Sequence, residues 1–277
     1  MKKILLILLL TIGYHVSNAQ VMTADTAAKG GRKSMLIGPL FMYFNLDRGQ
    51  TAKQTLHFVN NKNKTYRYTF NIVDFMVDSS GSNRNADSAA LEYSLASWIS
   101  LEQNYLEVGP NQRASIDITV KVPDNEEAVK SMKWAKVLAT PVPEDAGVTQ
   151  PSGRKVKIKQ SISVGAQIFN TPPNLSKDLK MLAFTQLNDS VFSIKCQNTG
   201  GQMLRARFSI ELTSAASIKN KTKIGDDEEI RILPNHVRVV NLKRPPGLAP
   251  GKYTAIGMVD AGEDVALEAA QLIVDLK

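Results

Sequence analysis

One pattern of alternating apolar residues occurs twice along this 277-residue chain. In the first copy, apolar side chains occupy every second position on both sides of the polar cluster Asn60–Lys64. The second copy repeats the first at a constant offset of 138 residues. The matched pairs are Asn60 and Asn198, Tyr66 and Leu204, Arg67 and Arg205, Phe70 and Phe208, and Ile72 and Ile210. A period of two with a polar break is typical of two antiparallel strands that each bury one face, and the constant offset indicates an internal repeat.

A second pair of segments repeats at a different offset. Leu106–Asn111 corresponds to Ile230–Asn235 at an offset of 124, and each segment contains a Pro-Asn turn followed by another apolar strand pattern. The shorter offset means that the first copy holds extra residues between its two halves. We expect this insert to be Asp78–Ala90, which is rich in Ser, Asn, Asp and Gly and therefore predicts a long surface loop.

Short strands at regular spacing, with turn signals between them and scarcely any helical periodicity, predict an all-β protein of two tandem immunoglobulin-like, Greek-key β-sandwiches. Two adjacent prolines, Pro172 and Pro173, mark the boundary, so we expect sandwiches over 35–171 and 172–277. In the second sandwich a Pro-Gly turn precedes Tyr253. Its hydroxyl is expected to bond the backbone upstream, as in a tyrosine corner.

The N-terminus has the features of a secretory signal peptide. Lys2 and Lys3 precede an apolar run from Ile4 to Ile12, and Ser17–Ala19 supplies small residues for cleavage. We therefore expect a signal peptide over 1–19, a flexible Gly-rich leader over 20–34, and export to the periplasm, the cell surface or the medium. No segment approaches the roughly 20 apolar residues that a membrane-spanning helix needs, so no membrane span is predicted.

Charge and cysteine usage narrow the function classes. The net charge is +8, but Asp and Glu are interspersed with Lys and Arg, which favours a solvated basic surface over a nucleic-acid-binding stripe. The one cysteine, Cys196, alternates with Phe192 and Ile194, so we expect a buried apolar side chain and no internal disulfide. Stability must then come from ordinary hydrophobic cores.

Catalytic groups are scarce beyond the signal sequence. Only His57 and His236 remain there, both at positions expected to face outward, and no nucleophile elbow, phosphate-binding loop or zinc motif occurs. The acidic run Asp226–Glu229 is the best candidate for a cation, although it lacks the spacing of a calcium loop and is better interpreted as a solvated loop. The sequence predicts no enzyme, no catalytic residue, no metal site and no cofactor.

The segment Lys155–Phe169 is the strongest candidate for a binding site. Its apolar side chains share one face and its lysines and serines share the other, after a Pro-containing loop over 141–153. One interpretation is an ordinary closing strand with a solvated face. The other is an edge strand whose front part pairs with a strand of a partner by β-augmentation. The partner-binding residues predicted under this second interpretation are Val156, Ile158, Ile162 and Val164.

The closing strand, read together with Pro172 and a second sandwich, resembles the periplasmic chaperones of the chaperone-usher pilus pathway. The segment Ala166–Pro172 carries this resemblance, which implies that the first domain lends a strand of alternating apolar residues to an incomplete pilus subunit. Those chaperones hold the subunit's terminal carboxylate with a lysine and an arginine. Here Gln167 aligns with the lysine, and Met35–Phe44 contains no arginine, so that anchor does not carry over.

A second resemblance covers more of the chain. Tyr43–Gln50, Phe58–Asn61 and the turns at Pro110-Asn111 and Pro123-Asp124 are similar to the WxL-interacting surface proteins, which implies a peptidoglycan-binding domain followed by a host-binding one. Two functions therefore stay open. The first is a periplasmic chaperone-like or scaffold protein that binds an envelope or surface protein, a pilus subunit among the candidates. The alternative is a surface adhesion or cell-wall glycan-binding module that uses Asp78–Ala90 or the acidic loop.

Overall fold

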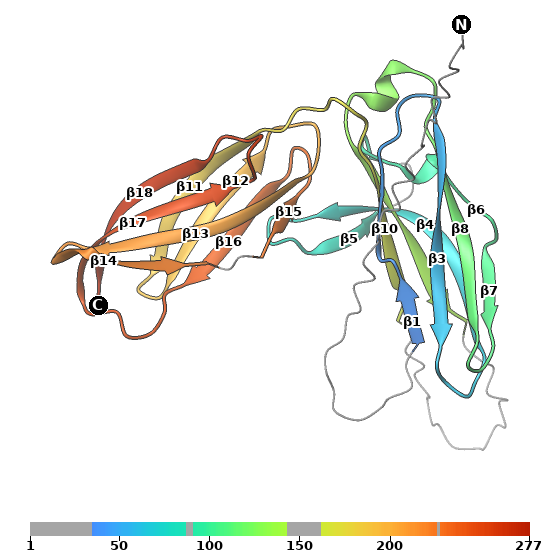
Figure 1. Ribbon diagram of the computed structural model, residues 1–277, viewed down its shortest axis with the longest axis horizontal. Helices are drawn as coiled ribbons and strands as arrows, with labels where there is room; N and C mark the ends of the chain where they lie inside the picture. Colours follow the sequence, from blue (N-terminus) through green and yellow to red (C-terminus); the bar gives the residue numbers. More distant parts are fainter. Residues whose placement is uncertain (1–34, 87–90, 143–161, 226–227) are drawn as a thin grey trace, which may run out of the picture. The chain divides into compact units, whose positions relative to one another are not determined.

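The structure, a computed structural model, describes residues 35–86, 91–142, 162–225 and 228–277. Its described part is built of β-strands, with two short 3₁₀ turns, η1 (Ala96–Trp98) and η2 (Glu126–Val129) (Figure 1). No helix in these ranges is long and apolar enough to cross a membrane. The all-β prediction is confirmed. The predicted signal peptide and leader fall on residues 1–34, which lie outside the described residues.

Two sheets form the first sandwich. One has the order β1-β3-β8-β6, and the other has the order β2-β10-β9-β4-β5 with β7 paired to β4. The strands are β1 (Met35–Gly38), β2 (Phe41–Phe44), β3 (Thr51–Asn60), β4 (Tyr66–Val77), β5 (Asn83–Ala86), β6 (Ile99–Leu101), β7 (Tyr105–Val108), β8 (Arg113–Lys121), β9 (Lys133–Pro141) and β10 (Val164–Asn170).

The core of the first sandwich follows from the alternation in its sequence. Leu56 and Phe58 on β3 face the same interior as Ile116 and Ile118 on β8, and all four are buried. Phe58 packs edge-on against Phe70 of the opposite sheet, with ring centroids 5.7 Å apart. Each fully buried side chain of this kind stabilises the fold by roughly 1.5–3 kcal/mol. The apolar positions with period two therefore supply the contacts that hold the two sheets together.

The first strand of the chain is divided between both sheets. β1 pairs antiparallel with β3, whereas β2 pairs parallel with β10. The division falls at Gly38 and Pro39, which are joined by a cis peptide bond. Proline has no N–H to donate to a ladder, which suits the point where the chain leaves one sheet for the other. The segment Met35–Phe44 therefore forms two strands in two sheets and not one continuous strand.

A buried asparagine fastens the last strand of this sandwich to the first. The Asn170 side chain accepts a hydrogen bond from the Leu46 N–H at 2.9 Å and donates one to the Leu46 carbonyl at 3.2 Å. Asn170 is fully buried, and a buried amide is tolerated only when its polar atoms are paired. The end of β10 is therefore fixed in position beside β2.

Two further sheets form the second sandwich, with the orders β11-β12-β16 and β14-β13-β17-β18, and β15 pairs with β13. The strands are β11 (Leu179–Asn188), β12 (Val191–Asn198), β13 (Leu204–Ser214), β14 (Ser217–Ile224), β15 (Ile230–Ile232), β16 (Val237–Lys243), β17 (Gly251–Asp260) and β18 (Glu268–Leu276). Their inward side chains form a separate core around Phe192, Ile194 and Phe208. The prediction of two immunoglobulin-like sandwiches is confirmed.

Three detailed expectations for the second sandwich can be compared with the structure. The Tyr253 hydroxyl donates to the Ala249 carbonyl at 2.8 Å, which confirms the tyrosine corner. Cys196 is fully buried between the sheets, as expected. His236 was expected to face outward from a strand, which is wrong. It lies in the turn between β15 and β16, half-buried, with Nδ1 2.8 Å from the Pro234 carbonyl oxygen.

The predicted loop over Asp78–Ala90 contains a strand. Residues Asn83–Ala86 form β5, which pairs antiparallel with Asp74–Val77 at the end of β4. Asp78 folds the connecting turn, because its carboxylate accepts hydrogen bonds from the Ser80 and Ser82 N–H groups at 2.9 and 3.0 Å. The polar composition indicated the turn but not the hairpin around it. Residues 87–90 lie outside the described residues.

Candidate functional site

The front part of β10 has one uncovered edge. β9 pairs with β10 along its whole length, from Val164 opposite Ala139 to Asn170 opposite Lys133. On the other side, β2 covers only Gln167–Asn170. The cover begins at Gln167, whose N–H donates to the Leu40 carbonyl at 2.8 Å. Among the described residues, Val164–Ala166 therefore have no strand beside them on that edge.

The apolar side chains of this segment form one row. Ala166 and Ile168 are buried in the core of the first sandwich, Val164 is half-buried, and the Ile162 residue is 74% exposed. Alternate residues of a strand point to the same side of a sheet, so Val164, Ala166 and Ile168 share the inner face. The row thus extends from the packed core towards solvent at its N-terminal end.

Ile162 and Ser163 precede the strand. The structure assigns neither to β10, so the expected strand from Lys155 through Phe169 is wrong at these two positions. The chain nevertheless stays close to β9 here, because the Ser163 hydroxyl lies 2.9 Å from the hydroxyl of Thr140. Of the four predicted partner-binding residues, Ile162 and Val164 can be placed, and Val156 and Ile158 lie outside the described residues.

A lysine that the sequence analysis overlooked lies on β9, the strand that pairs with the other edge of β10. Lys136 on β9 is opposite Gln167 of β10, and only 9% of it is exposed. Its Nζ donates to Oδ1 of Asn85 at 3.1 Å and lies 4.9 Å from the centre of the Phe75 ring. Burial lowers the pKa of Lys136. In the sequence, Lys136 stands at an outward position of an alternating strand. A lysine at such a position is ordinarily solvated, so nothing in the sequence marked this one as buried.

Gly165 leaves space for the Lys136 side chain. A Cβ atom built on Gly165 would lie 2.6 Å from Cδ of Lys136, so the aliphatic stem of the lysine packs over Gly165 where a side chain would otherwise stand. On the same outer face, the Phe169 ring stacks on Tyr43, with centroids 5.4 Å apart. The lysine stem and these aromatic rings therefore lie on the outer face of β10.

The residues considered from sequence for catalysis or metal binding are His57, His236 and the acidic run Asp226–Glu229. His57 is exposed on β3 of the first sandwich, and His236 lies in the second. Within the described residues, no group of three or more His, Cys, Asp or Glu side chains could hold a metal ion. Asp226 and Asp227 lie outside the described residues, and Glu229 is paired with Arg207 at 2.8 Å.

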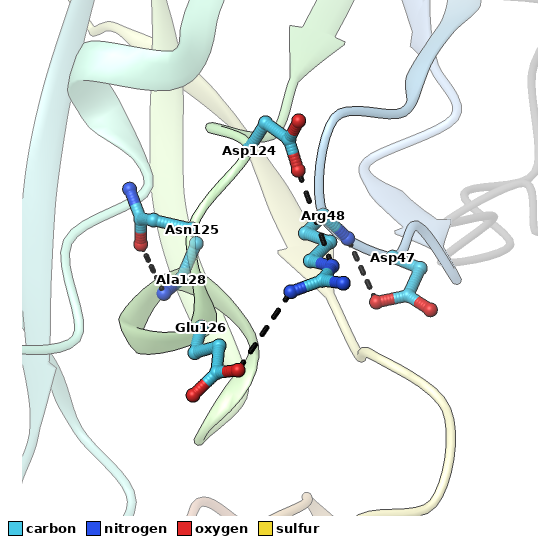
Figure 2. Close-up of polar contacts among 6 residues, drawn as sticks. All are labelled: Asp47, Arg48, Asp124, Asn125, Glu126 and Ala128. Atoms are coloured by element: carbon cyan, nitrogen blue, oxygen red, sulfur yellow. Dashed lines mark hydrogen bonds and ion pairs between the residues drawn. The ribbon is translucent and has the colours of Figure 1, made fainter.

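The turn after β2 forms a charged surface cluster, which Figure 2 shows in close-up. The Arg48 guanidinium lies 4.0 Å from a carboxylate oxygen of Asp124 and 3.8 Å from one of Glu126. Next to it, the Asn125 side chain caps η2 by accepting the Ala128 N–H at 2.9 Å. All three charged side chains are more than half exposed, and such surface pairs contribute at most about 1 kcal/mol. This cluster joins two turns at the surface of the first sandwich.

No protein-family model matches the sequence, and no curated protein matches it either. Solved structures do match. One is the class 5 fimbriae chaperone CfaA, at 12% identity and a TM-score of 0.48, over 88% of this chain and 99% of that one. Another is the CsuC–CsuE chaperone–tip adhesion subunit complex of Acinetobacter baumannii, at 8% identity and a TM-score of 0.46, over 86% of this chain and 97% of that one. The E. coli chaperone DraB matches at 13% identity and a TM-score of 0.41, over 88% of this chain and 97% of that one. Over most of its length, this chain is similar to fimbrial chaperones.

Proposed function

We propose that this chain is a non-enzymatic, exported protein that acts as a chaperone or scaffold and binds another envelope protein by β-strand augmentation along β10. The observation that carries the proposal is the uncovered edge at Val164–Ala166, which continues into the exposed side chain of Ile162. A pilus or surface-structure subunit is the class of partner that this mode of binding suits. The periplasm and the cell surface are the places where such subunits assemble.

The uncovered edge offers two kinds of interaction to a partner strand. Backbone N–H and C=O groups on that side of the ladder are free to pair, which gives affinity without regard to sequence. The accessible part of the row, Ile162 and Val164, adds register, because alternate side chains enter the partner's core. Covering an exposed isoleucine stabilises a complex by roughly 1.5–3 kcal/mol, so Ile162 is expected to contribute strongly.

The test is a pull-down from the native envelope with the wild-type protein and with Ile162→Asp, alone and combined with Ile158→Asp. Ile273→Asp is the matched control, because Ile273 on β18 of the second sandwich is 78% exposed and its replacement adds the same charge elsewhere. We expect one protein to be captured by the wild type and the control and lost from the Ile162 variants. Circular dichroism establishes that every variant is folded.

Two results would contradict the proposal. Equal capture by the wild type and the Ile162→Asp variants means that the edge of β10 is not the binding surface. Recovery of cell-wall glycan without any protein partner favours the adhesion or glycan-binding alternative.

A further inference from the structure

The hairpin of β4 and β5 ends in a turn that is unusually well ordered by its own side chains. The Asp78 carboxylate accepts hydrogen bonds from the N–H groups of Ser80 and Ser82, and from the Ser80 hydroxyl at 2.6 Å. The Asp78 carbonyl accepts the Gly81 N–H at 2.9 Å, and Gly81 has a positive φ of 90°. These bonds hold the pKa of Asp78 below its usual range. They also present the carbonyl of Ser79 outward.

The tip of this turn contacts a strand of the second sandwich. Contacts between described residues place both sandwiches in one compact unit. The Ser79 carbonyl accepts the N–H of Val239, on β16, at 2.8 Å. Beside this bond the Arg238 guanidinium lies against Gly81, so closely that a Cβ on Gly81 would lie 1.6 Å from Nη1. Burial lowers the pKa of Arg238, and the nearby Asp78 carboxylate opposes that shift.

The bond to Val239 is made on the outer edge of β16, where no other described strand of the second sandwich pairs with it. β16 pairs with β12 on one side only, with Val239 opposite Lys195. In an antiparallel ladder, successive residues point their N–H groups alternately toward and away from the partner strand. The N–H of Val239 points away from β12, since Ser79 receives it, and the N–H of Asn241 two residues later points the same way. Among the described residues, no backbone carbonyl of the hairpin accepts the N–H of Asn241.

We propose that the turn Asp78–Ser82 is a clasp that closes on the outer edge of β16 and makes the two sandwiches unfold as one cooperative unit. The insert is absent from the second copy of the repeat, so the clasp is a feature of the first sandwich alone. It also occupies an exposed strand edge, which would otherwise be open to pairing with other chains. The hairpin borders β4, whereas the proposed partner-binding edge lies on β10, and the two surfaces can be tested separately.

Residue-resolved amide hydrogen exchange on the full wild-type chain is the first test. The N–H groups of Val239 and Asn241 lie on the same strand and face the same side, so they differ chiefly in the bond to Ser79. We expect Val239 to be protected roughly fivefold or more over Asn241, the factor that one net hydrogen bond provides. Equal exchange of the two amides, after correction for their intrinsic rates, would overturn the clasp.

A pair of proline variants tests the coupling. Val239→Pro removes the N–H that Ser79 accepts, while Asn241→Pro removes an equivalent N–H without that bond, and proline is tolerated at an edge strand's outward positions. Calorimetry should show one unfolding transition for the wild type and Asn241→Pro, and two transitions for Val239→Pro. If Val239→Pro unfolds in a single transition as cooperative as that of the wild type, the turn does not couple the unfolding of the two sandwiches. That result would overturn the coupling even if hydrogen exchange detects the bond to Ser79.

Discussion

Asn60 and Asn198 occupy equivalent corners of the two sandwiches and make equivalent hydrogen bonds. Both are fully buried. The Asn60 amide nitrogen lies 2.8–3.0 Å from the carbonyls of Lys64, Val108 and Gly109, and that of Asn198 lies 2.8 and 2.9 Å from those of Gln202 and Ile232. Each side-chain oxygen accepts the N–H two residues later. The asparagine thus fixes both a strand end and the turn that follows it.

Replacing either corner asparagine by alanine should destabilise its own sandwich by roughly 2–4 kcal/mol, because several buried carbonyls lose their donor at once. Chemical denaturation of Asn60→Ala and Asn198→Ala measures the effect. Asn61→Ala is the control, since Asn61 is exposed and adjacent to the first corner. A loss in Asn60→Ala no larger than in Asn61→Ala would contradict this account.

The tyrosine corner makes a smaller and more local contribution. Tyr253→Phe keeps the buried ring but removes the hydroxyl that donates to Ala249, so the free energy of unfolding should fall by about 1 kcal/mol. Thermal unfolding monitored by circular dichroism provides the measurement. Tyr105→Phe, at an exposed position of the first sandwich, should change the unfolding temperature little. An equal effect of the two substitutions would argue against the corner.

Cys196 should be inert in the folded protein. Burial raises the pKa of its thiol to about 12, so the reactive thiolate is scarce at neutral pH, and reagents cannot reach the sulfur. Alkylation followed by mass spectrometry should therefore show no labelling at pH 8 in buffer and complete labelling in guanidinium chloride. Rapid labelling of the native protein would show that the second sandwich opens at β12.

Lys136 should make stability depend on alkaline pH. Its folded-state pKa is lowered, so the folded protein loses this proton before the unfolded chain does. At neutral pH the folded protein bears the cost of burying the charged lysine. This cost is relieved as the pH rises from the folded-state pKa to 10.5, the ordinary pKa of a lysine in the unfolded chain. We expect Lys136→Met to raise the unfolding temperature at pH 7 and to lose that advantage by pH 10. A difference that stays constant with pH would contradict this.

Much of the fold could be predicted because the apolar positions alternate cleanly. The repeat between Asn60 and Asn198 located both corners, and the positive φ of Asn111 and Asn235 (56° and 61°) shows why each Pro-Asn turn recurs. The break at Pro39 could not be predicted from alternation, because both sheets accept the same apolar pattern. β5 was missed because three of its four residues, Asn83, Arg84 and Asn85, are polar, and the strand is formed by pairing with β4 and not by burial.

The candidate site could be predicted only in part. The alternation put Val164, Ala166 and Ile168 on one face, as in the structure, but how far β2 covers β10 depends on where the chain changes sheets at Gly38 and Pro39. Lys136 was missed because its hydrogen-bond partner Asn85 lies on β5, within the segment that the sequence analysis interpreted as a loop. Both omissions concern contacts between segments distant in the chain.

The parallel pairing of β2 with β10 has a consequence for biosynthesis. Leu46 and Asn170, which the buried amide joins, are 124 residues apart, so β2 lacks its partner strand β10 until Asn170 of the 277-residue polypeptide has been made. Contacts of such long sequence separation close late and slow folding. During that interval the apolar face of β2 has to be kept from other chains by whatever receives the nascent protein.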